Sequence, residues 1–366
     1  MKKYDILNDL VKFNTIDDKE NKEIIDYIES VLKSKNFRTD YKGKYLIMSY
    51  GNNPQIGFLG HTDTVEFING WNTDPFTLKE TKNKLYGLGV CDMKSGIAAM
   101  LDAILSCNLS DIQNGIKLYF TYDEEKRFGG IYDIIKAGEK FPDFMIFGEP
   151  TYNEVLIGCK GLLECDLHFK GIKVHSSNPA KGKSANLNAI RFLSELEKYY
   201  IENIKNDISN EFDIPYTTMN VGILRGGSAK NSIPAECYAT LDFRVIKSEH
   251  IEKITEMIDF LSKKYDCDYE MLEKIKPFMN EVDVENNRKT ANFLTEASVV
   301  NCKSKIILGA GPVTAHEINE YIEKESYDKL VKQYKNIIEK YIWLIVYKKV
   351  KFREMLLLKT FSCIKI

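Results

Sequence analysis

The sequence predicts an α/β protein: a domain built on a mostly parallel sheet with helices on both faces, into which a ferredoxin-like α+β domain is inserted. Two observations predict this fold. Short apolar runs alternate with helical patterns at both ends of the chain, whereas the middle has strictly alternating strands and two long amphipathic helices. The length of 366 residues leaves room for two hydrophobic cores.

The first domain is assigned residues 1–161 and 277–366. Dense apolar runs, typical of buried strands, lie at 56–60, 116–123 and 144–148, and helical spacing lies at 21–35 and 95–107. Strands that alternate with helices favour a parallel sheet covered on both faces. Beyond Pro277 the same pattern returns, with apolar runs at 293–300 and 305–311 and a helix at about 323–340.

The inserted domain is assigned residues 162–276, and we expect it to serve as a lid or dimerisation domain. Its first strand alternates strictly, so one set of side chains is expected to face the core: Leu163, Cys165, Leu167 and Phe169. The elements that follow are a helix at 184–205, strands near 217–224 and 235–246, a helix at 248–264 opened by Ser248, and a strand near 267–275. The order β-α-β-β-α-β is that of the ferredoxin-like unit.

Composition limits the classes of partner. The chain is 44% hydrophobic and 28% charged with a formal net charge of −2, which gives no reason to expect nucleic acid or an acidic membrane surface as partner. Eight scattered cysteines without a C-x-x-C pair indicate free thiols in a reducing compartment. The first 22 residues lack the apolar stretch of a signal peptide, so we expect a cytoplasmic protein.

The C-terminal segment 343–366 is apolar and basic without clear periodicity. It fits a final strand, a helix or a segment that touches a membrane, and the sequence does not assign its role. No apolar run in the chain reaches the ~18 residues that a membrane span needs.

Ionisable residues recur where the apolar strands end. They are His61 and Asp63 after the first run, Glu124 and Glu125 after the second, Glu149 after the third, His316 after the late run, and Asp92 in a glycine-rich loop before a helix. Because strand ends gather at one edge of an open α/β sheet, these side chains are expected to form one site. Taken singly, each has a plainer interpretation, such as a hydrogen-bonded His-x-Asp pair or a solvated acidic turn.

A metal centre accounts for this concentration of carboxylates, which would otherwise repel one another and take up protons. Nitrogen and carboxylate ligands without cysteine suit Zn²⁺, and Mn²⁺ and Co²⁺ are alternatives. Five ligands exceed the three that one catalytic zinc usually takes. Two ions ~3.5–4 Å apart with a bridging carboxylate would use all five.

Five motifs in order resemble the two-zinc aminoacylase/carboxypeptidase family: GHTDTV, YGLGVCDMKSG, YDEE, FGEP and AHEINEY. That family includes acetylornithine deacetylase and succinyl-diaminopimelate desuccinylase. The resemblance implies two metal ions, one held by His61, Asp92 and Glu149 and the other by Asp92, Glu125 and His316. It also implies that Asp63 fixes the tautomer of His61 through its other ring nitrogen and that Glu124 is the general base.

The same resemblance suggests further residues. His175 in HSSNP would reach a partner subunit's active site, although in isolation it reads equally as a loop histidine. Asn231 and Arg244 would bind substrate, because an arginine can hold a carboxylate with two hydrogen bonds; the plainer alternative for Arg244 is a surface salt bridge. Thr295, in the Thr-Glu-Ala segment that is similar to the deacetylase pattern, is also expected to bind substrate. The other two histidines, His168 and His250, are expected at the surface.

The expected function is hydrolysis of the amide bond of an N-acyl amino acid, most closely that of an acetylornithine deacetylase releasing acetate and ornithine. The alternatives are a succinyl-diaminopimelate desuccinylase, a broad aminoacylase or dipeptidase, and a catalytically silent relative that only binds. The expected partners are a small-molecule substrate and a second copy of the chain, with no nucleic acid and no membrane.

Overall fold

The computed structural model describes residues 2–111, 115–280 and 289–344, with the side chains of 341–344 left out. The segment 345–366, which holds nearly all of the apolar and basic tail, lies outside the described residues. The chain divides into two compact units. Unit 1 comprises Met1–Ile157, Asn280–Arg288 and Thr295–Ile366, and unit 2 comprises Gly158–Met279 and Lys289–Leu294.

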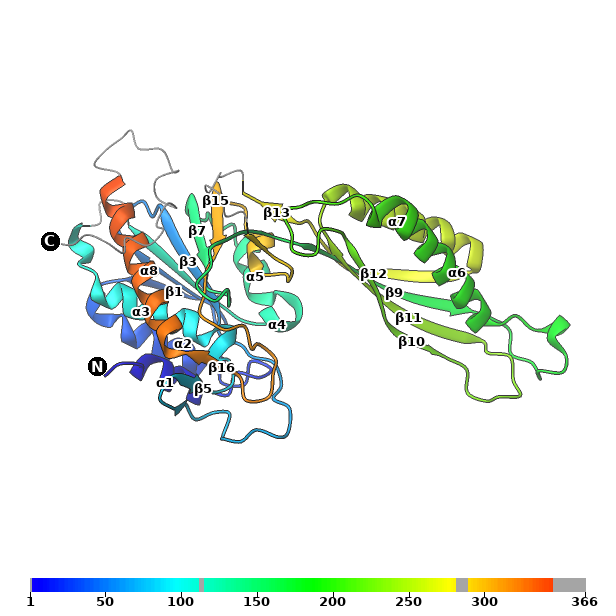
Figure 1. Cartoon of the computed structure of the whole chain (residues 1–366), viewed down its shortest axis with the longest axis horizontal. Coiled ribbons are helices and arrows are strands. Elements are labelled where there is room, and N and C mark those ends of the chain that lie inside the picture. The colour runs from blue at the N-terminus through cyan, green and yellow to red at the C-terminus, as the bar shows by residue number, and fades with distance from the viewer. Residues whose placement is uncertain (1, 112–114, 281–288, 345–366) are drawn as a thin grey trace. The chain divides into compact units, whose positions relative to one another are not determined.

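A nine-stranded sheet with a parallel centre, most of which belongs to unit 1, has the order β1-β2-β6-β3-β7-β15-β8-β13 with β14 on β8 (Figure 1). The bounds are β1 Arg38–Tyr41, β2 Leu46–Tyr50, β3 Ile56–His61, β6 Ile116–Thr121, β7 Phe144–Phe147, β8 Leu156–Cys159, β13 Phe278–Met279, β14 Lys289–Ala291 and β15 Ser304–Ile307. Strands β6, β3, β7 and β15 are parallel to their neighbours in that group, whereas β1, β2, β8 and β13 pair antiparallel. The parallel sheet that the sequence predicts is therefore confirmed at the centre, and the edges are antiparallel.

Helices cover both faces of this sheet. They are α1 Asp5–Lys12, α2 Asn21–Val31, α3 Ser95–Ser106, α4 Glu124–Arg127, α5 Gly129–Lys136 and α8 Lys324–Leu344. Phe58, Leu118 and Ile146 join α1, α2, α3 and α8 in one core, because alternate residues of a strand face the same side. The residues between them, such as Tyr119 and Met145, are also buried, which is why these strands read as continuous apolar runs.

A small three-stranded sheet lies at the edge of unit 1. It consists of β4 Lys79–Glu80, β5 Lys84–Tyr86 and β16 Tyr321–Glu323 in the order β16-β5-β4. The pairing of Tyr321 with Tyr86 brings the segment after His316 next to the loop that leads to Asp92.

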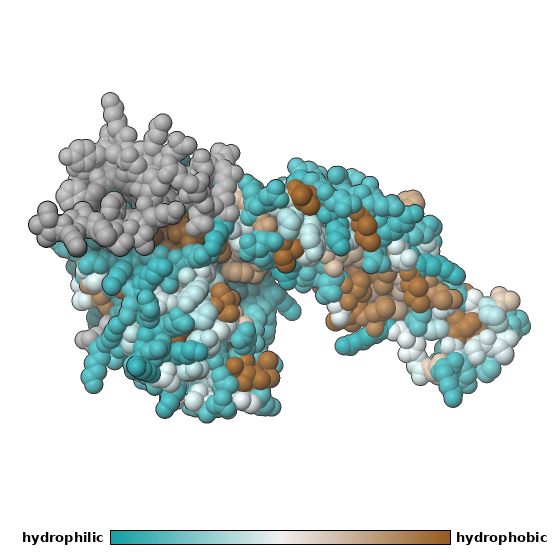
Figure 2. All heavy atoms as spheres, viewed as in Figure 1, coloured by the Kyte–Doolittle hydropathy of each residue, from teal (hydrophilic) through white to brown (hydrophobic). Residues whose placement is uncertain are grey.

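Unit 2 is ferredoxin-like. Its elements are β9 Gly161–Lys170, α6 Ala185–Tyr200, β10 Thr218–Gly226, β11 Glu236–Val245, α7 Ser248–Tyr265 and β12 Cys267–Ile275. The strands form an antiparallel sheet in the order β10-β11-β9-β12. Leu163, Cys165, Leu167 and Phe169 are buried with residues of α6 and α7, as the alternation predicts. Figure 2 shows that apolar residues also form an exposed patch on the visible face of this unit.

One local prediction about α7 is wrong. His250 is fully buried and not at the surface, because it lies one helical turn before Ile254 on the inward face. Its ring nitrogens lie 2.7 Å from Thr217 Oγ1 and 3.1 Å from Asp207 Oδ2, which satisfies both. The helix begins at Ser248, as the sequence predicts. His168 is on the solvent side of β9 as predicted, stacked on Tyr238 with ring centroids 4.3 Å apart.

The described cysteines are free thiols, six of them buried and Cys302 partly exposed. Among the described helices, none combines the length and apolar character that a membrane crossing requires.

Candidate active site

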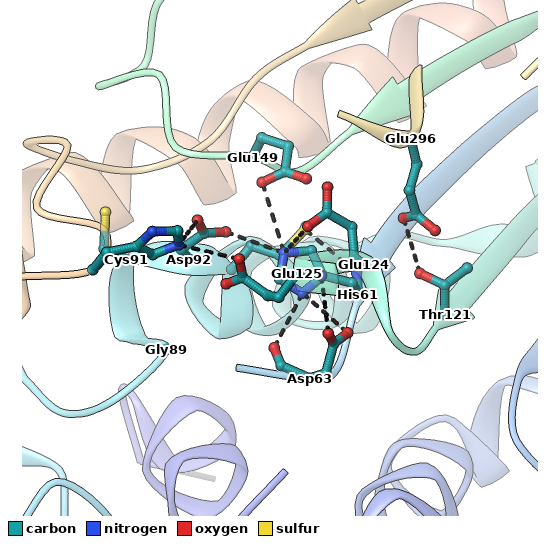
Figure 3. Close-up of polar contacts among 12 residues, drawn as sticks. His61, Asp63, Gly89, Cys91, Asp92, Thr121, Glu124, Glu125, Glu149 and Glu296 are labelled. Carbon is teal, nitrogen blue, oxygen red and sulfur yellow. Dashed lines mark hydrogen bonds and ion pairs between the residues drawn. The ribbon is translucent and has the colours of Figure 1, made fainter. Parts of the chain in front are cut away.

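Six ionisable side chains from five segments of unit 1 meet at the carboxyl ends of its parallel strands (Figure 3). The last residue of β3 is His61, the first two residues of α4 directly after β6 are Glu124 and Glu125, and Glu149 follows β7. Asp92 lies in the turn before α3, and His316 lies in the loop between β15 and β16. The structure therefore brings together the residues that the sequence places at separate strand ends.

His61 lies at the centre of the cluster and is fully buried. Its Nε2 atom is 3.1 Å from Asp92 Oδ1, and its Nδ1 atom is 3.1 Å from the main-chain oxygen of Asp63. The Asp63 carboxylate is farther away, at 3.5 Å, and its other oxygen accepts a hydrogen bond of 3.1 Å from the main-chain N–H of Glu125. The predicted tautomer control is thus provided by the carbonyl of Asp63, while its carboxylate fixes the start of α4.

Asp92 lies between the two histidines. His316 Nε2 is 3.7 Å from Asp92 Oδ2 and 3.1 Å from Glu125 Oε2. On the other side, Glu149 Oε2 and Glu124 Oε2 are 3.8 and 3.9 Å from His61 Nε2. One carboxylate oxygen of Asp92 therefore faces each histidine, which is the arrangement that a bridging ligand needs.

Burial sets the proton affinities of the cluster. It raises the pKa of Glu124 and of Glu149 well above the ordinary value, and neighbouring carboxylates add to the effect. Burial would lower the pKa of His61, but the hydrogen bonds to Asp63 and Asp92 outweigh it and raise that pKa well above its ordinary value. The hydrogen bond to Glu125 raises the pKa of His316 to about 9. Without a cation, the cluster would hold protons that a metal ion would displace.

The donor set fits metal ions. Two sets of side chains each offer three ligand atoms that lie within 4.8 Å of one another. One set is His61, Asp92 and Glu125, and the other is His61, Glu124 and Glu149. Glu125 Oε1 is buried and has no hydrogen-bond partner, as expected of an atom aimed at an ion. These groupings differ from the predicted ligand sets in that Glu124 joins one and His316, whose side chain is 55% exposed, joins neither.

Comparison with known proteins shows the family to which the chain belongs. A model of the peptidase dimerisation domain matches residues 157–269. The acetylornithine deacetylase of Photorhabdus laumondii is 33% identical over 344 residues, which cover 84% of this chain and 87% of that protein. This chain belongs to the M20 family of metallopeptidases.

Solved M20 structures share the fold. An M20 family metallo-carboxypeptidase from Sulfolobus solfataricus has a TM-score of 0.76 at 18% identity, covering 94% of this chain and 100% of that one. A dinuclear metal-binding M20 peptidase from Bacillus subtilis has a TM-score of 0.67 at 12% identity, covering 94% of this chain and 97% of that one. The α/β fold with its inserted domain is therefore that of M20 enzymes.

The predicted M20 residues outside the cluster have different surroundings. In unit 2, His175 and Asn231 are exposed neighbours, because His175 pairs with Ser232 and Ser176 N–H donates to the Asn231 carbonyl. Arg244 forms a salt bridge to Asp242, with Nη2 3.0 Å from Oδ2. In unit 1, Thr295 is fully buried, and its hydroxyl accepts a 3.0 Å hydrogen bond from Ala297 N–H.

Two buried carboxyl groups near the site were not nominated from the sequence. Glu296 is fully buried, receives a 2.9 Å hydrogen bond from Thr121 and lies to one side of Glu124 (Figure 3). Glu320 accepts hydrogen bonds from the main chain around Asp92. Burial raises the pKa of each to about 8. Both belong to motifs that the sequence had shown, but the motifs alone did not separate these carboxyl groups from their neighbours.

Proposed function

We propose that this chain hydrolyses the amide bond of an N-acyl amino acid and that its substrate is N-acetylornithine, with acetate and ornithine as products. The observation that carries the proposal is the cluster around His61 and Asp92, which supplies a metal-ligand set and a further carboxylate, Glu124, at the same place. The choice of substrate is supported by relatives named acetylornithine deacetylase, one of them 33% identical over 84% of the chain.

The metal ligands in this proposal are His61, Asp92, Glu125, Glu149 and His316. They would hold two ions, Zn²⁺ by preference and Co²⁺ or Mn²⁺ as alternatives, because imidazole and carboxylate suit all three. When bound, such ions polarise a carbonyl group and make water more acidic. The fold contributes ligands held on strand ends and helix starts, which limits their movement when the ions bind.

Glu124 is assigned the proton transfer. Its side chain is 10% exposed, so it can meet a reactant while bulk water is largely excluded. Burial and the nearby carboxylates raise its pKa well above the ordinary value, which suits a group that takes a proton from water and passes it to the leaving amine. Asp63 supports the transfer indirectly, since its hydrogen bond to Glu125 N–H fixes the first turn of α4.

The remaining roles are assigned to three residues of unit 2 and to Thr295 of unit 1. We assign His175 of the partner subunit to hydrogen bonding with the oxyanion of the attacked acyl group, and Asn231 and Arg244 to the substrate. Arg244 would have to share its guanidinium between Asp242 and a substrate carboxylate, which its five N–H donors allow. Thr295 would act by capping the turn that carries Glu296.

A release assay tests the proposal. Chelator-treated protein, reconstituted with Zn²⁺ or Co²⁺, is given N-acetylornithine, N-succinyl-diaminopimelate, other acetylated amino acids and dipeptides. The proposal predicts metal-dependent turnover with the highest kcat/KM for N-acetylornithine. A higher value for another amide would reassign the substrate. Bound metal without turnover of any of these compounds would contradict the proposed hydrolysis.

A further inference from the structure

We propose that Glu320 is a positioning residue that fixes the aim of Asp92 by holding the main chain of its loop. The inference rests on the proposed metal centre and adds a residue to it. Glu320 is 2% exposed, and its carboxylate accepts three main-chain hydrogen bonds from one short loop. Gly89 N–H donates to Oε2 at 2.8 Å, and the N–H groups of Cys91 and Asp92 donate to Oε1 at 2.6 and 3.0 Å.

The loop needs an external support because its backbone is not regular. Gly89 has a φ of +73°, and a Cβ placed there would lie 2.5 Å from Thr64 Cγ2. Asp92 has extended dihedral angles (φ −121°, ψ 100°) inside a turn that otherwise leads into α3. Donors in such a segment cannot pair along a helix, so a buried carboxylate that accepts three of them replaces the missing ladder. One of the three donors is the N–H of Asp92 itself.

Glu320 also connects two loops of the site. One loop carries Asp92, and the other carries the proposed ligand His316. Glu320 immediately precedes β16, whose pairing with β5 sets it beside the loop, and its own carbonyl accepts from Gly87 N–H at 3.2 Å. Thr314 closes the loop around His316 through hydrogen bonds with both main-chain groups of Tyr321, at 2.7 and 3.0 Å. A shift at Glu320 would therefore move Asp92 and His316 relative to each other.

The test is the substitution Glu320→Gln. The side-chain amide keeps the shape but offers one oxygen, and its NH₂ group faces a main-chain donor, so at least one of the three hydrogen bonds is lost. The matched control is Glu323→Gln, the same change at the last residue of the strand that Glu320 precedes. Glu323 is half-buried and accepts instead from Tyr152 O–H at 2.7 Å. Metal content after dialysis, metal affinity by chelator competition and the unfolding midpoint of the metal-free protein are measured for both.

We expect Glu320→Gln to lower metal affinity by roughly 10–100-fold, the usual effect of removing a partner that orients a ligand. Excess metal should restore part of the turnover. An unfolding midpoint of the metal-free variant that stays close to that of the wild type would distinguish this effect from a general loss of stability, which excess metal could also offset. Glu323→Gln should bind metal as the wild type does. If Glu320→Gln does not fold, Glu320→Asp, which keeps the carboxyl group but not its reach, should give the same loss of metal affinity.

Two results would overturn the inference, and they are distinguishable. If the wild type binds two ions and folded Glu320→Gln or Glu320→Asp binds them equally well, Glu320 does not position Asp92, while the proposed function stands. If the wild type binds no metal, the proposed centre is wrong and the inference is lost with it.

Discussion

At the scale of single residues, two adjacent glutamates are assigned different tasks. The Glu125 carboxylate lies 3.1 Å from Nε2 of His316, which places the two side chains to share a metal ion. Glu124 is assigned only proton transfer. We predict that Glu124→Gln keeps both metal ions and lowers turnover by ~10²–10⁴-fold, the usual cost of losing a general base. The matched variant Glu125→Gln should lose metal instead. Elemental analysis alongside acetate release checks both.

Turnover of Glu124→Gln within about threefold of the wild type would remove Glu124 from the mechanism, since that lies far below the usual loss. Loss of metal from this variant would instead make Glu124 a ligand, as one of the two groups of ligand atoms allows.

Glu296 gives a prediction about pH. Burial raises its pKa from 4.5 to about 8, so between these values the folded protein keeps a proton that the unfolded chain releases. The stability of the metal-free wild type should therefore fall as pH rises through this window, by about 1.4 kcal/mol for each unit of pKa difference. Glu296→Gln, which cannot ionise, should gain relative stability over the same range.

Chemical denaturation at a series of pH values checks this, with Glu323→Gln as the control that should follow the wild type. Parallel stability curves for Glu296→Gln and the wild type would show that Glu296 ionises at an ordinary pH.

At the scale of elements, the periodicity of apolar residues along the chain predicts the helices and strands whose form depends on local sequence. The strand at 56–60 and the helix at 95–107 match β3 and α3 closely, because their side chains repeat with the period of the element. His250 was misplaced because a buried histidine paired with Thr217 and Asp207 has the same local sequence as an exposed one. Glu320 could not be found this way, since its partners are 228 to 231 residues away in the chain.

The edge strand β10 gives a prediction for the interface between copies. Among the described strands it pairs only with β11, and Val221, Ile223 and Leu224 on it are 36%, 42% and 51% exposed. An unpaired apolar edge is a site for pairing with another strand. We predict that Ile223→Lys converts a homodimer to a monomer, as measured by size exclusion with light scattering.

The opposite edge of the same sheet provides the control. Leu272 on β12 is 43% exposed, and Leu272→Lys should leave the dimer intact. Dissociation by Leu272→Lys alone would place the interface on β12, and a monomeric wild type would contradict the dimer.

At the scale of the whole molecule, the sequence predicts one inserted segment, 162–276, whereas the compact unit is Gly158–Met279 together with Lys289–Leu294. The return of the chain through the three-residue strand β14 explains the difference, because so short an element leaves no periodic signal. The antiparallel edges of the unit 1 sheet were missed for a related reason, since apolar runs show burial but not strand direction.

A shared active site in a homodimer predicts complementation between two inactive variants. His175→Ala and Glu124→Gln chains, mixed and allowed to exchange, should regain activity in heterodimers, because one of the two sites then has both an intact base and an intact partner histidine. Random pairing of equal amounts makes half of the dimers mixed, so about a quarter of wild-type activity is the ceiling. No recovery after verified subunit exchange would show that each chain completes its own site.

The central claim is that the strand-end cluster binds two metal ions that together support amide hydrolysis. The most direct measurement is a titration of the metal-free protein with Zn²⁺, in which bound metal per chain and acetate release from N-acetylornithine are recorded at each point, in the wild type and in Asp92→Ala. Because Asp92 faces both histidines, we predict that the wild type binds two ions per chain and that its activity rises as they bind. We predict that Asp92→Ala binds neither ion tightly and has no activity. Two tightly bound ions in Asp92→Ala, or full wild-type activity without bound metal, would contradict the account.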